Sequence, residues 1–229
     1  MRNSHELMHG LERPPALPIG PRRRAECSPF LQPTRPASPM PTILSVNTAR
    51  VETRLIQGRA VATAIGKTPV AGAVAVRPLG LDGDEQADLS VHGGLSKAVY
   101  LYPAAHYPFW QTVRSQARVA APGAALPFGA LGENLTVEGL DEAALWIGDR
   151  LRLPGCVLAV SEPRQPCFKF NAAMGFTQAS SLMNQSGYCG AYLAVIEAGQ
   201  LQAGDPIELV PGPREVNLRE LFLARVRRR

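Results

Sequence analysis

The sequence predicts a mainly β fold, a β-barrel with a few helices. From residue 41 onward, short runs rich in β-branched residues are separated by Gly and Pro, which is the pattern of strands joined by turns. Segments 147–153 and 203–209 each place a Gly-Asp pair ahead of an alternating strand, and these two residue types favour turns. Many short strands at modest spacing favour a barrel or a sandwich over a doubly wound sheet.

The elements expected along the chain follow from the same signals. Alternating or wholly apolar runs mark strands, and apolar residues at helical spacing mark helices. Asn217 and Glu220 resemble a capping box that opens the last helix. The expected helices are 104–116, 177–185 and the one that follows Asn217. The expected strands are 42–46, 60–65, 72–76, 97–102, 135–137, 149–153, 157–162, 190–197 and 206–210.

The positive charge of the chain is concentrated near its two ends. The net charge is +5, yet residues 1–40 hold six Arg against three Glu, and residues 214–229 hold six Arg against two Glu. The segment between them, 41–213, carries 12 basic and 14 acidic residues. Because a slightly acidic body does not offer a polyphosphate-binding surface, we expect no nucleic-acid partner. This charge distribution is still compatible with a local basic pocket that binds one anionic ligand.

We expect the chain to have three parts. Residues 1–40 contain eight Pro and an Arg-Arg-Arg run without apolar periodicity, which predicts a disordered N-terminal extension, with a transit peptide as the alternative. Met40 directly precedes the patterned sequence and is a candidate start of the natural protein. Residues 41–213 form the expected β-barrel domain, and residues 214–229 form a C-terminal helix.

The composition argues against several classes of protein. No run approaches the roughly 18 apolar residues of a membrane span, and no charged start leads into an apolar signal core, so we expect no membrane association. The four cysteines form no C-x-x-C pair, which argues against a zinc knuckle and a dithiol redox site. The sequence also offers no disulfide framework, and we therefore expect a reducing, cytoplasmic location.

Cys167 is the candidate reactive cysteine, in the segment Glu162-Pro-Arg-Gln-Pro-Cys. Two prolines fix the backbone around Arg164, and Arg164 and Lys169 can both favour the thiolate. A rigid loop presenting such a sulfur at a strand end suits a soft metal or a nucleophilic reaction, while a structural cysteine is the open alternative. Cys156 and Cys189 are expected to be structural.

Two further segments carry polar residues next to glycines. In His92–Gly94, the glycines permit close approach to a ligand and the histidine can donate or titrate, and Lys97 follows as a cation. In Gly132–Asn134, a Gly turn precedes an amide that can donate and accept hydrogen bonds. Each segment also has a structural interpretation, a turn with a surface histidine for the first and entry into a strand for the second.

In combination, the patterns D-x-x-x-H-G-G-x-x-K, G-E-N-L and E-P-R-x-P-C resemble the MOSC domain family, named for the C-terminal domain of molybdenum-cofactor sulfurases. More narrowly they resemble its YiiM-like branch, which is associated with resistance to 6-N-hydroxylaminopurine. The resemblance covers residues 41–213 and implies a β-barrel that binds molybdopterin. It implies Cys167 as the metal ligand, and Cys167 and His92 as catalytic residues. The implied cofactor-binding residues are His92, Gly93, Gly94, Lys97, Asn134 and Arg164.

The same resemblance implies a molybdenum-dependent oxidoreductase that reduces N-hydroxylated purines or related amines to the amine, as a detoxification reaction. A separate reductase would supply the electrons, because the chain shows no flavin, haem or iron–sulfur motif of its own. The alternative is a sulfur or molybdenum-cofactor carrier with a persulfide on Cys167, and a barrel that has lost its function is a third interpretation. The family also has a broad association with pyridoxal phosphate binding.

One feature departs from the YiiM-like pattern. Proteins of that branch usually carry a helical appendage after the barrel, and residues 214–229 match only its beginning. Homodimer contacts or the docking of a redox partner would depend on such an appendage. The chemistry of the barrel would not.

Overall fold

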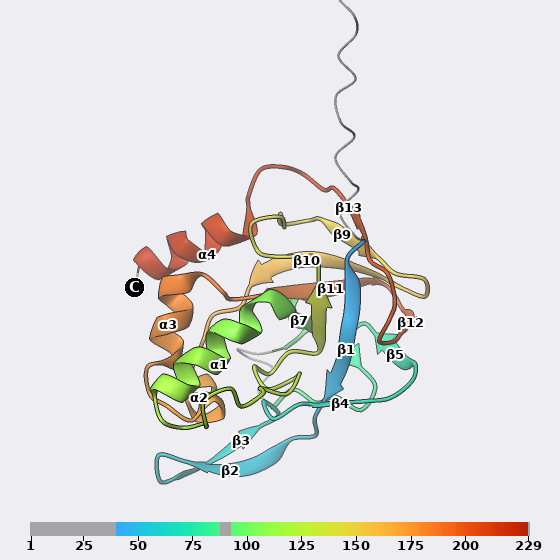
Figure 1. Ribbon diagram of the computed structural model, residues 1–229. Helices are drawn as coiled ribbons and strands as arrows, with labels where there is room; N and C mark the ends of the chain where they lie inside the picture. The colour runs from blue at the N-terminus through green and yellow to red at the C-terminus, as the bar shows by residue number, and fades with distance from the viewer. Residues whose placement is uncertain (1–39, 88–92, 229) are drawn as a thin grey trace, which may run out of the picture. The chain divides into compact units, whose positions relative to one another are not determined.

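The computed structural model describes residues 40–87 and 93–228. These residues belong to one compact unit that is mainly strands with few helices (Figure 1), which confirms the predicted fold class. The expected N-terminal extension, Met40 apart, lies outside the described residues. The strands are β1 (Thr42–Thr48), β2 (Glu52–Ile56), β3 (Arg59–Thr63), β4 (Thr68–Pro69), β5 (Val74–Arg77), β6 (Gly80–Leu81), β7 (Val99–Pro103), β8 (Leu135–Glu138), β9 (Arg150–Arg152), β10 (Val157–Pro163), β11 (Ala191–Glu197), β12 (Gly199–Leu201) and β13 (Glu208–Val210).

An eight-stranded sheet forms the body of the fold, in the order β13-β9-β10-β11-β7-β8-β1-β4. Neighbouring strands are antiparallel except β7 and β8, which run parallel with Leu101 opposite Leu135. A parallel pair needs a long crossover, and here the crossover carries the first α-helix. Two smaller sheets, β12-β5-β6 and the hairpin β2-β3, accompany the large one.

The large sheet curls toward a barrel without closing into a continuous ladder. Thr42 at the start of β1 forms an isolated antiparallel bridge with Pro206, just before β13. The Ile43 amide donates to the Asp205 carbonyl at 3.0 Å, and the Ile207 amide donates to the Pro41 carbonyl at 2.7 Å. The barrel predicted from the sequence is therefore present as a strongly curved sheet joined by a short seam.

Two apolar clusters pack on opposite faces of the central strands. The first includes Val46, Leu101 and Leu158 from the strands of the large sheet, and the second includes Trp110 and Phe170 from helices. Strand β7 is buried along its whole length, because side chains alternate between faces and both faces are covered. Its sequence, Val-Tyr-Leu-Tyr-Pro, accordingly has no polar side.

The helices are short and follow local signals in the sequence. Asn217 caps the last one, accepting from the amides of Arg219 at 3.0 Å and Glu220 at 3.3 Å, as its capping pattern predicts. Among the described residues, no helix has the length and apolar character needed to cross a membrane. The helices are α1 (Tyr107–Gln116), α2 (Phe168–Met174), α3 (Ala179–Ser186) and α4 (Leu218–Arg227), with 3-10 turns η1 (Leu95–Lys97) and η2 (Ala104–His106).

The nine expected strands and three expected helices are all present, but strands β2, β4, β6 and β12 and helix α2 were not predicted. Strand β2 pairs with β3 as an exposed hairpin, so no apolar face marks it in the sequence. Helix α2 begins immediately after Cys167, where only a rigid loop was expected. Gly175 ends it in the left-handed conformation, with φ of 85°, a common helix stop.

Candidate functional site

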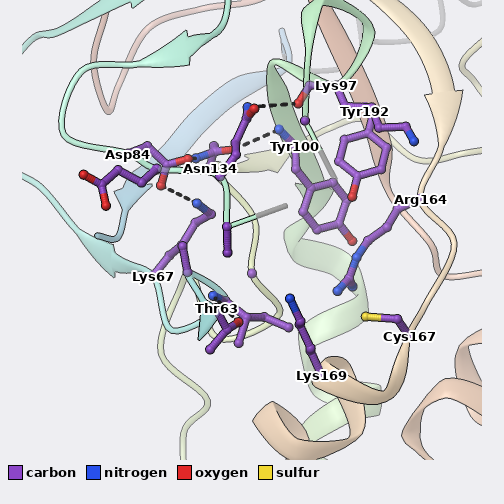
Figure 2. Close-up of a pocket in the computed structure, with 17 residues that line it drawn as sticks. Thr63, Lys67, Asp84, Lys97, Tyr100, Asn134, Arg164, Cys167, Lys169 and Tyr192 are labelled. Carbon is purple, nitrogen blue, oxygen red and sulfur yellow. Dashed lines mark hydrogen bonds and ion pairs between the residues drawn. The ribbon is translucent and has the colours of Figure 1, made fainter. Parts of the chain in front are cut away.

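A pocket enclosing about 660 Å³, part of it open to solvent, lies where several connections and strand ends of the barrel meet (Figure 2). The connection between β3 and β4, the segment after β6, the turns before β7 and β8, and the connection from β10 to α2 all contribute to its wall. Its charged lining residues are Lys67, Asp84, Glu85, Lys97, Arg164 and Lys169.

Most of the residues predicted as a site come together in this pocket. Gly94 is the residue next to the pocket-lining Gly93, and it precedes η1 with φ of 79°. His92 lies outside the described residues, so its place is not described. The predicted residues that line the pocket are Gly93, Lys97, Asn134, Arg164 and Cys167.

Cys167 lies at the junction between β10 and α2, half-buried, with its sulfur directed into the pocket (Figure 2). Its carbonyl accepts from the Phe170 amide at 2.9 Å and from the Ser180 hydroxyl at 3.1 Å, which fixes the backbone that carries the thiol. Cys156 and Cys189 are buried, as expected, and burial raises the pKa of Cys156 to about 11. They are structural, whereas Cys167 faces the pocket.

Arg164 is 5% exposed and stacks against two aromatic rings. Its guanidinium carbon lies 5.0 Å from the Tyr100 ring centre and 4.8 Å from that of Phe170. Its Nη1 atom makes no hydrogen bond with any residue that the structure describes. A buried donor without an acceptor is costly, so the arrangement favours an acceptor on a ligand, most simply an anion.

Lys97 approaches the same pocket from the end of η1. Its Nζ lies 3.8 Å from Oε1 of Glu162 and 5.9 Å from the centre of the Tyr192 ring. The other oxygen of Glu162 accepts from Arg225 of α4 at 3.1 Å. Glu162 therefore connects the C-terminal helix to a lysine that lines the pocket.

Asn134 has all of its amide hydrogen-bonding groups engaged by protein. Its Oδ1 accepts from the Tyr100 amide at 3.0 Å, and its Nδ2 donates to the Asn47 carbonyl at 3.2 Å and to Oδ2 of Asp84 at 2.9 Å. These bonds join β1, β7 and the turn before β8 to the segment after β6. Asn134 thus shapes the pocket wall through its neighbours.

Glu133, its neighbour in the Gly-Glu-Asn-Leu segment, is completely buried. Its carboxylate accepts from the amides of Gly129 at 2.8 Å and Leu131 at 3.1 Å, from the Thr136 hydroxyl at 2.8 Å, and from the Tyr107 hydroxyl. Burial raises the pKa of Glu133, and these donors partly offset that effect. The residue fixes the turn that presents Asn134.

An ion pair between Lys67 and Asp84 was not predicted from the sequence. The two side chains are only 8% and 5% exposed, and both line the pocket. Burial lowers the pKa of Lys67, against the opposing attraction of Asp84. Lys67 and Asp84 are 17 positions apart in the chain, and the segment between them holds no local motif; the only available signal was a lysine beside a glycine in a turn.

Gln86 was also missed, although it holds one of the predicted segments. Its Nε2 donates to the carbonyls of Leu79 at 3.0 Å and Lys97 at 3.4 Å, and its Oε1 accepts from the Gly94 amide at 3.2 Å. One side chain therefore clamps both ends of the turn from Gly94 to Lys97. Because an isolated glutamine has no sequence signature for such a role, only the structure identifies it.

The sequence is similar to that of known proteins. The MOSC domain family profile matches residues 88–208. The chain is 41% identical over 169 residues to the uncharacterized protein YflK of Bacillus subtilis, covering 74% of this chain and 73% of that protein. It is 38% identical over 160 residues to the protein YiiM of Escherichia coli, covering 69% and 68%. It is 33% identical over 181 residues to a protein of Gibberella moniliformis named Reductase, covering 79% of this chain and 31% of that longer protein.

The fold has solved counterparts as well. The crystal structure of YiiM from Geobacillus stearothermophilus superposes with a TM-score of 0.65 at 29% identity, covering 82% of this chain and 85% of that chain. Sequence and structure agree on the same relationship. The chain therefore belongs to the MOSC domain family, a family associated with the molybdenum cofactor, and within it to the YiiM-like branch.

Proposed function

We propose that this protein is a molybdenum-cofactor-binding oxidoreductase that reduces N-hydroxylated substrates, such as 6-N-hydroxylaminopurine, to the parent amine. The observation that carries the proposal is the placement of a pocket-facing thiol, Cys167, beside a buried guanidinium, Arg164, whose Nη1 atom has no acceptor among the described residues. The fungal relative named Reductase and the YiiM relatives support an oxidoreductase in this family.

The donor set of the pocket fits this cofactor. Within residues 40–87 and 93–228, no three His, Cys, Asp or Glu side chains are close enough to hold a metal by themselves. A metal that arrives with donor atoms of its own needs only one soft protein ligand, and a thiolate suits it. Cys167 would supply that ligand. Arg164 and Lys97 would bind the anionic part of the cofactor through charge-assisted hydrogen bonds.

When bound, the cofactor would supply two-electron oxygen-atom chemistry. The protein would hold it, orient the substrate in the pocket and supply protons. Overall, R–NH–OH, two electrons and two protons give R–NH2 and water. The electrons would come from a separate reductase that acts on this protein as a partner. The small N-hydroxylated substrate would enter from the solvent side of the pocket.

Metal and pterin analysis of purified protein tests the cofactor. We expect close to one molybdenum and one pterin per chain in the wild type, and neither in Cys167→Ala. Cys156→Ala is the matched control, because Cys156 is buried in the apolar core of the curved sheet and should leave both contents unchanged. Full molybdenum in Cys167→Ala would contradict the ligand role. A persulfide on Cys167 without metal would favour a sulfur carrier instead.

A turnover assay tests the substrate. Protein that contains molybdenum is supplied with a chemical reductant and 6-N-hydroxylaminopurine, and adenine is measured. Adenine formation that requires Cys167 supports the proposal. No adenine from protein with full molybdenum content rejects this substrate.

A further inference from the structure

The lysines of this chain have an unusual distribution. The chain has 24 basic residues, of which only three, Lys67, Lys97 and Lys169, are lysines, and all three line the one pocket described above. Lysine and arginine both supply positive charge, but a desolvated ammonium can release its proton near neutral pH and a guanidinium does not. Every lysine ammonium of this chain therefore lies at the pocket.

Lys67 and Lys97 both form ion pairs at this pocket, and Lys67 is the more buried of the two. It directly precedes β4 and pairs with Oδ1 of Asp84, at 8% side-chain exposure. Asp84 is its one hydrogen-bond partner among the described residues. An ammonium has three N–H groups, so the others remain for a ligand in the pocket that Lys67 lines. Figure 2 shows Lys67 and Asp84 on one side of the pocket and Arg164 and Cys167 on the other.

Two further hydrogen bonds fix the position of the Asp84 carboxylate. Its Oδ1 also accepts from the Ala49 amide at 2.9 Å, and its Oδ2 accepts from Nδ2 of Asn134 at 2.9 Å. Asn134 is in turn fixed by the Tyr100 amide on β7. A continuous series of hydrogen bonds therefore runs from the sheet through Asn134 and Asp84 to the ammonium of Lys67.

We propose that Lys67 is a proton donor of the reaction, with Asp84 and Asn134 as positioning residues. This inference rests on the reduction of N-hydroxylated substrates proposed above. The N–O bond breaks, two electrons come from the external reductant, and two protons complete the amine and water. Lys67 donates one of these protons, the solvent supplies the other, and the neutral amine of Lys67 is reprotonated by solvent.

The electrostatic surroundings suit such a donor. Burial lowers the pKa of Lys67, and the carboxylates of Asp84 and Glu133 work in the opposite direction. An acid works best when its pKa is near the working pH. Burial brings the pKa of Lys67 down in that direction, and the two carboxylates limit the decrease so that the ammonium keeps its proton until the reaction. The other charged groups that line the pocket are Glu85, Lys97, Arg164 and Lys169.

The titration of Lys67 can be measured without any turnover. Protein labelled with 13C-lysine should give three side-chain signals, because the chain has three lysines. We expect the signal that disappears in Lys67→Arg to titrate below the usual lysine pKa of about 10.4. In Asp84→Asn its midpoint should fall further, because the attraction of the carboxylate is lost. A Lys67 midpoint at or above the usual value would overturn the proposal.

The pH dependence of turnover tests the catalytic role. The wild-type kcat/KM should fall on the alkaline side with the midpoint found for Lys67 by NMR. Lys67→Arg keeps the charge but holds its proton, so kcat should fall at least about a hundredfold and the alkaline decline should disappear, with molybdenum content unchanged. Lys67→Met is a second variant in case arginine distorts the site, and it should show the same loss.

A surface exchange provides the control. Arg152→Lys alters an exposed residue that pairs with Glu208, both side chains being 59% exposed, and it should leave the pH profile as in the wild type. Turnover with a wild-type profile in both Lys67 variants would overturn the proton-donor role alone. If the wild type forms no adenine at any pH, the proposed reduction fails as well, and the NMR midpoint still shows whether Lys67 titrates as expected.

Discussion

Asn134 and Asp84 are joined by a hydrogen bond of 2.9 Å, from Nδ2 of the amide to Oδ2 of the carboxylate. The bond connects the turn before β8 with the segment after β6, 50 residues apart. Its polarity is specific, since the carboxylate can only accept and must face a donor. The pocket wall therefore depends on an amide at one position and an acid at the other.

Asn134→Asp should destabilise the protein by about 3 kcal/mol, because a buried donor is replaced by a second carboxylate facing Asp84. Chemical denaturation measures the change. The double variant Asn134→Asp/Asp84→Asn should recover part of the loss, since an amide at 84 can donate to a carboxylate at 134. A double variant no more stable than Asn134→Asp would contradict this account of the pair.

Gln86→Ala should loosen the turn from Gly94 to Lys97 more than the rest of the fold. The substitution removes the hydrogen bonds that clamp this turn, each worth about 1 kcal/mol. Hydrogen exchange should speed up by about tenfold at the Gly94 and Lys97 amides, and molybdenum retention should decrease. Gln86→Glu keeps the acceptor for the Gly94 amide, so its exchange rates should lie between those of the wild type and of Gln86→Ala. Exchange that accelerates equally across β10 and β11 would indicate global destabilisation instead.

The stability of the wild type relative to Lys67→Met should increase with pH on the alkaline side. The pKa of Lys67 is lowered in the folded state, so between its folded and unfolded pKa values the unfolded chain binds more protons. Unfolding free energy then rises with pH by up to about 1.4 kcal/mol per unit for this one group. Melting temperatures of both proteins across the neutral to alkaline range test the sign. A difference that is constant or shrinks would be inconsistent with a lowered pKa.

Gly190→Ala should cost about 3–5 kcal/mol, far more than the same change at Gly58. Gly190 has φ of 66°, and a Cβ there would collide with the carbonyl of Leu101 and with the rings of Tyr100 and Tyr102. Gly58 has φ of 76°, but the space that a Cβ would occupy there is open, so only the backbone strain of about 1–2 kcal/mol applies. Urea denaturation of both variants gives the comparison. Equal losses at the two positions would show that the collision is relieved.

The sequence predicts the strands well, because in this chain Gly and Pro mark where strands end. Strand β2 escapes detection, since its residues are exposed apart from Ile56 and show no apolar face. Helix α2 is seven residues long, too short for an apolar periodicity to stand out. Pro166 before it and Gly175 after it are the signals that could have revealed it.

The site is predictable where its residues are contiguous in the chain. Arg164 and Cys167 share one motif and line one pocket, as expected from the sequence. Lys67 and Asp84 could not be found in this way, since their pairing depends on how β4 and the segment after β6 meet. The amide of Asn134 was expected to bind cofactor, a role that has not been tested, and its groups are all used within the protein.

The confinement of lysine to the pocket affects how the protein can be handled. Succinimidyl esters, amine-directed cross-linkers and lysine-based immobilisation resins would find side-chain targets only at Lys67, Lys97 and Lys169. Attachment through lysine would therefore obstruct the cavity that such experiments are meant to probe. An amine-reactive fragment library, by contrast, would have its covalent side-chain targets confined to the site of interest.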